Sequence, residues 1–108
     1  ATSKYLRSMA TLYHPSRAEL ALDSVLAALG DPTRLGIVAQ LAKLGEANCG
    51  TLGVDIPKST VSHHFKVLRE SGLVQVRQEG TLRRLRLRRD DLQAHFPGLL
   101  DSVLASIR

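Results

Sequence analysis

The stretch STVSHHFKVLRESGLVQVRQEGT, residues 59–81, joins a helical pattern directly to a strand pattern. Apolar Val61, Phe65 and Leu68 recur at the spacing of one helix face. Ser59 is a suitable N-cap for this helix, and Gly72 is a suitable end. On the side opposite the apolar positions we expect a polar face that suits contact with base edges in a DNA groove. This face is predicted to contain Thr60, Ser62, His63, His64 and Lys66.

The segment that follows predicts a hairpin with one apolar face and one arginine-rich face. From Val74, valines alternate with polar residues, and after a Glu-Gly turn Leu85 and Leu87 alternate with arginines. Alternation with a period of two is typical of a half-buried strand. Leu82 is out of phase with the later leucines, so we expect a loop or bulge around residues 80–83.

Two helices are predicted upstream of this region. The first runs from about Ser16 to a stop at Gly30. The second begins with Asp31 as N-cap and Pro32 at the first helical position, and it ends at Gly45. The first helix carries one apolar stripe, which comprises Leu22, Val25, Leu26 and Leu29.

The remaining segments are less regular. Residues 46–57 are rich in glycine and turn-forming residues, and they leave room for at most one short helix, near residues 51–53. After the hairpin, Asp90 or Asp91 is expected to cap a last helical region, which Pro97 divides. The broad apolar stripe of this region comprises Phe96, Leu99, Leu100, Val103, Leu104 and Ile107.

The order of these elements predicts a mainly α fold with a small β-hairpin, the winged helix-turn-helix. In this fold the second helix of the motif enters the major groove of DNA, while the hairpin reaches the DNA backbone or the adjacent minor groove. A chain of 108 residues has the length of one domain, so we expect a single winged-helix domain over residues 1–108. Residues 1–14 lack a clear period and are expected to form a short helix or a loose arm.

Positive charge gathers in one part of the chain. The whole sequence has 15 basic and 10 acidic residues, a formal net charge of +5, and residues 58–89 alone contain nine basic and two acidic residues. A local excess of this kind is the electrostatic footprint of a nucleic-acid-binding surface. From charge alone, a solvated basic face without a partner stays open as the alternative.

Composition excludes several classes of protein. The one cysteine, Cys49, cannot form an internal disulfide or a structural cysteine-rich zinc site. No apolar run approaches the roughly 18 residues of a membrane-spanning helix, and no long apolar segment follows the N-terminal charges as in a signal peptide. We therefore expect a cytoplasmic protein without a membrane partner. Ser62 and His63 lack an identifiable orienting carboxylate or oxyanion donor, so we expect no enzyme.

Two separated motifs resemble the ArsR/SmtB family of bacterial transcriptional repressors. ALGDPTRLGIVAQL, residues 28–41, resembles the family's entry into its second core helix, and residues 59–81 resemble its recognition helix and wing. The resemblance covers roughly residues 20–89 and implies a winged-helix homodimer that binds operator DNA and is released by an effector, often a metal ion. Carried onto this sequence, it assigns DNA contact to Ser59, Thr60, Ser62, His63, His64 and Lys66 in the helix, and to Arg77, Gly80, Thr81, Arg83, Arg84 and Arg86 in the wing.

The resemblance also implies how two chains associate. In the family the first and last helices pack together at the dimer interface, which here corresponds to about residues 16–30 and 90–108. The C-terminal stripe is broad enough to pack inward and against a second chain at once, although ordinary core packing is the alternative. The predicted interface residues are Leu22, Val25, Leu99, Leu100, Val103, Leu104 and Ile107.

The effector site is the least determined feature. Family metal sensors often hold a paired-cysteine motif near residues 46–56, whereas this chain has only Cys49. Cys49 is a candidate ligand or, through an intersubunit disulfide, a candidate redox switch, and an inert, packed thiol is the alternative. We expect any inducing nickel, cobalt or zinc ion to bind imidazole and carboxylate groups near the dimer interface. The candidates are His14, Asp91 and His95, with Glu19 or Asp101 as further oxygen donors; ordinary surface histidines are the alternative.

Two other functions stay open. The first is an effector-independent repressor that is controlled by a regulatory protein partner or by its own abundance. The second is a non-specific nucleic-acid-binding or interaction module. A comparison of a palindromic duplex with a random duplex at equal salt separates a specific repressor from such a module.

Overall fold

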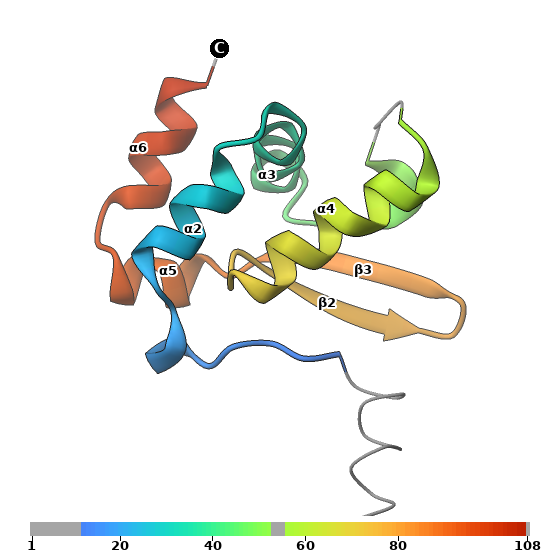
Figure 1. Cartoon of the computed structure of the whole chain (residues 1–108), viewed down its shortest axis with the longest axis horizontal. Helices are drawn as coiled ribbons and strands as arrows, with labels where there is room; N and C mark the ends of the chain where they lie inside the picture. The colour runs from blue at the N-terminus through green and yellow to red at the C-terminus, as the bar shows by residue number, and fades with distance from the viewer. Residues whose placement is uncertain (1–11, 53–55, 108) are drawn as a thin grey trace, which may run out of the picture.

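The computed structural model describes residues 12–52 and 56–107, and it has helices packed against a small antiparallel sheet (Figure 1). This architecture confirms the predicted fold class, a mainly α winged helix-turn-helix. In chain order the elements are the 3-10 helix η1 (Arg17–Glu19), α2 (Leu22–Leu29), α3 (Pro32–Leu44), β1 (Glu46–Asn48), the 3-10 helix η2 (Cys49–Thr51), α4 (Lys58–Glu70), β2 (Val74–Glu79), β3 (Leu82–Leu87), α5 (Arg89–His95) and α6 (Leu99–Ser106).

The start of α3 follows the predicted capping pattern. Oδ2 of Asp31 accepts hydrogen bonds from the backbone N–H groups of Thr33 and Arg34, at 2.9 and 3.1 Å, and Pro32 occupies the first helical position. The helix ends at Gly45, as predicted, where a φ of 80° lies in the region that favours glycine.

The predicted helix from Ser16 is wrong in its first part. The chain forms η1 and then becomes extended at Leu20 and Ala21, so α2 begins only at Leu22. Leu20 is buried, and its side chain would clash with a Cβ placed at Gly72. The extended backbone at Leu20 therefore directs this apolar side chain into the core. A continuous helix would direct the same side chain elsewhere.

Helix α4 differs slightly from its predicted boundaries. It begins at Lys58 after Pro57, so Ser59 lies in the first turn and is not the N-cap. The helix ends before Gly72, as predicted, and Gly72 has a φ of 89°. Its N–H donates to the carbonyl of Arg69 at 3.1 Å, and the backbone then turns directly into β2.

The wing is a regular hairpin. The strands β2 and β3 pair antiparallel from Val74 opposite Leu87 to Glu79 opposite Leu82, so the turn contains only Gly80 and Thr81. Of the loop or bulge expected around residues 80–83, the structure has a loop that is limited to Gly80 and Thr81, and the regular pairing of β2 with β3 contains no bulge. Leu82 is out of phase because it stands at the hairpin tip on the arginine side of the strand, where its side chain is exposed.

A third strand was absent from the sequence-based prediction. Strand β1 pairs antiparallel with β3, with Ala47 opposite Leu85, and gives the sheet order β1-β3-β2. Three residues are too short to show an alternating pattern, and the glycine-rich surroundings suggested only turns. The short helix η2 follows at Cys49–Thr51, slightly before the predicted position; residues 53–55 lie outside the described residues.

The C-terminal region is divided at Pro97, as predicted, into α5 and α6. The expected cap at Asp90 or Asp91 is wrong, because Arg88 is the N-cap residue of α5 and both aspartates lie in its first turn. Negative side chains in a first helical turn still interact favourably with the helix dipole. Within the described ranges, no helix has the length and apolar character needed to cross a membrane.

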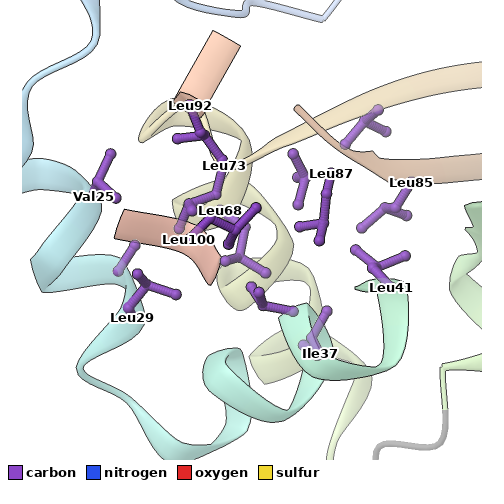
Figure 2. Packing of buried hydrophobic residues seen from close by; sticks show 14 of the residues in the cluster. Val25, Leu29, Ile37, Leu41, Leu68, Leu73, Leu85, Leu87, Leu92 and Leu100 are labelled. Atoms are coloured by element: carbon purple, nitrogen blue, oxygen red, sulfur yellow. The ribbon is translucent and has the colours of Figure 1, made fainter. Parts of the chain in front are cut away.

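The hydrophobic core joins the helices to the sheet. Figure 2 shows Leu68, Leu73, Leu92 and Leu100, from different parts of the chain, pointing into the same space. Burial of one such side chain stabilises the fold by roughly 1.5–3 kcal/mol. The largest fully buried side chains are Ile37, Leu41, Leu68, Leu73, Leu85, Leu92, Val25, Val38 and Val74.

Candidate DNA interface

Helix α4 presents an exposed polar face. Its inner side holds Leu68, which is fully buried, while Val61 and Phe65 are half-buried. The outer side carries hydroxyl, imidazole and ammonium groups that can donate to or accept from base edges and phosphates. All of these predicted contact residues are exposed: Ser59, Thr60, Ser62, His63 and Lys66.

His64 is a correction to the predicted outer face. The residue is only 9% exposed, and its Nδ1 lies 3.1 Å from Nη1 of Arg34 and 4.0 Å from Oδ2 of Asp31. The reason is helical spacing, since residue 64 precedes Leu68 by four positions and therefore shares its inward face. A buried His64 is not available for direct contact with DNA.

The wing arginines fall into two groups. Arg77 and Arg84 each form an ion pair with Glu79 at 2.9 Å, and Arg77 also pairs with Glu46 at 2.9 Å. The hydrogen bond from Arg77 holds the pKa of Glu79 below its usual value. Glu79 and Glu46 therefore partly neutralise the positive face that the sequence predicted.

The second group has no carboxylate partner among the described residues. Arg83 is exposed near the wing tip, and Arg86 is exposed at the wing base, where it donates to Oε1 of Gln75 at 2.8 Å. The tip itself consists of Gly80, with a φ of 61°, and exposed Thr81. Arg83 and Arg86 have the charge and exposure that phosphate contacts require.

An open cleft of about 720 Å³ is lined by residues of both α4 and the wing. Cys49 lines it and is half-buried, and burial raises the pKa of this thiol despite the opposing charge of Arg83. A thiol held in its protonated form is a poor nucleophile and metal ligand. The cationic rim of the cleft includes Lys58 and Lys66, and Lys58 is an exposed α4 residue that the sequence-based prediction omitted.

Both ring nitrogens of His14, a predicted metal ligand, are engaged in hydrogen bonds. Its Nε2 accepts a hydrogen bond from the backbone N–H of Val76 at 2.9 Å, and its Nδ1 lies 2.9 Å from the carbonyl of Leu12. Because Nε2 accepts, the ring proton is on Nδ1 and is donated to that carbonyl. Neither ring nitrogen has a lone pair free for a metal ion.

The other metal candidates are also separated or engaged. Asp91 pairs with Arg17 at 2.7 Å and with Arg88 at 2.9 Å, and these hydrogen bonds lower its pKa. Oε1 of Glu19 accepts from the backbone of Ser16 at 2.7 Å. His95 is exposed, with its ring packed edge-on against Phe96. Residues 12–52 and 56–107 contain no group of three histidine, cysteine, aspartate or glutamate residues that could hold a metal ion.

The predicted interface residues also divide into two groups. Val25 and Leu100 are 1% and 6% exposed, so they belong to the core of the chain and are not available to a second one. Leu22 is 47% exposed, and an additional leucine of α2, Leu26, is equally exposed. The half-buried members of the predicted set are Leu99, Val103, Leu104 and Ile107.

The fold and the site define the class of the protein, a winged-helix DNA-binding protein. Its marks are the short helix η2, the polar outer face of α4 and the basic wing of β2 and β3. The profile of a helix-turn-helix domain family matches residues 29–77. The HTH-type transcriptional regulator YceK of Bacillus subtilis is 39% identical over 82 residues, which cover 73% of this chain and 82% of YceK. The arsenical resistance operon repressor of Escherichia coli is 46% identical over 56 residues, which cover 48% of this chain and 46% of the repressor.

Solved structures agree with this class. The transcriptional repressor BigR from Xylella fastidiosa superposes with a TM-score of 0.63 at 29% identity, over 81% of this chain and 86% of BigR. An ArsR family transcriptional regulator has the same TM-score at 23% identity, over 81% of this chain and 93% of its own, and shares the fold. The chain belongs to the ArsR family of winged-helix transcriptional regulators.

Proposed function

We propose that this chain is a homodimeric repressor that binds a specific operator through α4 and the wing. The observation that carries the proposal is the exposed polar face of α4 beside the exposed wing arginines. Relatives named as transcriptional regulators and repressors support it. Ser62 and His63 read base edges in the major groove, and Lys66 and Arg83 hold the phosphates.

The dimer forms through apolar side chains that one chain leaves open. Leu22 and Leu26 of α2 are each 47% exposed, and Val103 and Leu104 of α6 are half-buried. A domain of this size buries only somewhat more than about 60% of its unfolded surface, so a second chain adds apolar burial that the monomer lacks. Two recognition helices joined in this way select a palindromic site.

An effector releases the repressor from its operator. This part rests on the resemblance to the ArsR/SmtB family, which implies release by an effector; the Escherichia coli relative is named as the repressor of an arsenical resistance operon. A site built on His14 is not part of the proposal, because both of its ring nitrogens are hydrogen-bonded. The test challenges the operator complex separately with nickel, cobalt, zinc and arsenite, and repeats each challenge with Cys49→Ser. If none of them releases the DNA, the effector-independent repressor replaces this part of the proposal.

Selection of bound sequences from a random duplex pool tests the operator-binding part. The proposal predicts enrichment of one palindrome with half-sites about 10 base pairs apart, bound by two chains per duplex. Enrichment of no sequence would favour the non-specific module. A single half-site bound by one chain would contradict the dimer.

A further inference from the structure

Arg34, in the first turn of α3, connects two other helices. Its Nε donates to the carbonyl of Ala28 at 2.7 Å, and its Nη2 donates to the carbonyl of Ala27 at 3.3 Å. Both carbonyls belong to the last turn of α2. Its Nη1 lies 3.1 Å from Nδ1 of His64, in the middle of α4. One guanidinium therefore joins α2, α3 and α4.

The α2 end of this connection is favourable for a cation. The last carbonyls of a helix lack partners within the helix, and the helix dipole places partial negative charge there. Gly30 alone separates the end of α2 from Asp31, the N-cap of α3, so the first turn of α3 lies beside these carbonyls. The planar guanidinium can serve several acceptors at once from one fixed position.

The contact with α4 determines the tautomer of His64. A guanidinium can only donate, so Nδ1 of His64 accepts and the ring proton is on Nε2. His64 is 9% exposed, and a hydrogen bond from a charged donor to a buried acceptor is stronger than one in water. Ser62 and His63 directly precede His64 in α4. A displacement of the helix at His64 therefore also displaces the groove-facing side chains of Ser62 and His63.

We propose that Arg34 is a positioning residue for operator recognition, which fixes α4 relative to α2 through His64. This inference rests on the proposed function, since it assumes that the α4 face reads an operator. It predicts that loss of the Arg34–His64 hydrogen bond reduces discrimination between DNA sequences. General affinity for DNA is retained, because neither side chain is a phosphate contact in this arrangement.

The experiment compares His64→Leu with His64→Asn. Leucine fills the buried space without an acceptor, whereas Oδ1 of asparagine replaces the position of Nδ1 and can accept from Arg34. The probes are the duplex that the parent protein selects from a random pool and a scrambled duplex of equal length. We expect His64→Leu to lower the ratio of the two affinities at least about tenfold, the size of one lost base contact, and His64→Asn to retain most of it.

A second pair of variants tests the other partner. Arg34→Lys keeps the charge but supplies only one point donor, so it is expected to lower the same ratio while the salt dependence of binding stays unchanged. The control Lys43→Gln removes an exposed charge from the same helix and is expected to leave the ratio unchanged. Melting temperatures of all variants verify that each is folded.

Three results would overturn the inference. In the first, His64→Leu and His64→Asn discriminate equally well; in the second, Arg34→Lys retains the full ratio. In the third, Arg34→Lys makes the salt dependence shallower, which would make Arg34 itself a phosphate contact. A parent protein that does not discriminate would instead contradict the proposed function, so the two failures are distinguishable.

Discussion

Nε2 of His14 accepts a hydrogen bond from the backbone N–H of Val76 at 2.9 Å, and this bond ties the N-terminal arm, here residues 12–15, to the wing. Strand β2 is an edge of the sheet, so its outward N–H groups have no strand partner. The arm is further held by Arg88, which donates to the carbonyl of Pro15 at 2.7 Å, and by Arg69, which donates to the carbonyl of Tyr13 at 3.2 Å. Residues far apart in sequence thereby fix the base of the wing.

This bond predicts a pH dependence of stability. Burial lowers the pKa of His14, aided by Arg69 and Arg88 and opposed by the hydrogen bond to Leu12. The unfolded chain therefore takes up a proton at a higher pH than the folded one, so stability is complete above the unfolded pKa of about 6.5 and falls as the pH is lowered through the folded value. Thermal melts between pH 8 and 5 should show this loss in the parent protein.

The variant His14→Leu isolates the contribution of His14. We expect a loss of about 1 kcal/mol at pH 8, the typical value of one hydrogen bond, and a shallower fall toward pH 5. His95→Leu is the matched control, because His95 is exposed. If both variants fall as steeply as the parent protein, the protonation of His14 does not control stability.

Glu79, the acidic partner of Arg77 and Arg84 in the wing, is expected to limit binding to DNA. Glu79→Gln removes the carboxylate that pairs with Arg77 and Arg84, so Arg84 becomes available to phosphates while Arg77 keeps its ion pair with Glu46. We expect tighter binding to every duplex and, for a dimer with one freed Arg84 per protomer, a salt slope that is steeper by about two, since each added phosphate contact contributes about 0.9. Glu70→Gln removes the same charge from an exposed position on α4. Equal effects of the two variants would mean that overall charge, and not the freed arginines, is responsible.

The apolar surface of α6 is expected to hold the dimer together. Val103→Glu introduces a charge into this half-buried surface, and sedimentation should then detect monomers. Operator affinity should fall with it, because two half-sites are no longer joined. Ala105→Glu places the same charge on an exposed position of the same helix and should leave the dimer intact. A dimeric Val103→Glu variant would place the interface elsewhere.

The turn between α4 and the wing requires glycine. Gly72 has a φ of 89°, and an added Cβ would clash with the side chain of Leu20. Gly72→Ala should therefore destabilise the fold by more than about 1 kcal/mol in chemical denaturation. Gly36→Ala is the contrasting variant, because Gly36 lies within α3 with no atom within 4 Å of an added Cβ. It should stabilise the protein by roughly 0.5–1 kcal/mol, and a neutral Gly72→Ala would contradict this account of the turn.

Local patterns predicted most of the fold. The cap at Asp31, the end of α3 at Gly45 and the division at Pro97 depend on residues next to each other in sequence, and all three were confirmed. The broken helix after Ser16 depends instead on burial of Leu20 against Gly72, a contact between distant residues. No local pattern contains that information.

The candidate site shows the same limit. The exposure of Ser62 and His63 follows from helical periodicity, and so does the burial of His64, which its spacing from Leu68 could have indicated. The partners of buried polar groups could not be predicted in this way. Arg34 reaches His64 across 30 positions, and His14 reaches Val76 across 62.

The affinities for the selected operator and for a scrambled duplex, measured at equal salt over a range of salt concentrations, test operator recognition by the dimer most directly. We expect the operator to be bound at least about 10³-fold more tightly. With about four phosphate contacts per protomer, the logarithm of the affinity should fall against the logarithm of the salt concentration with a slope near roughly −7. A ratio near one, or a slope shallower than about −2, would contradict a specific, phosphate-anchored repressor.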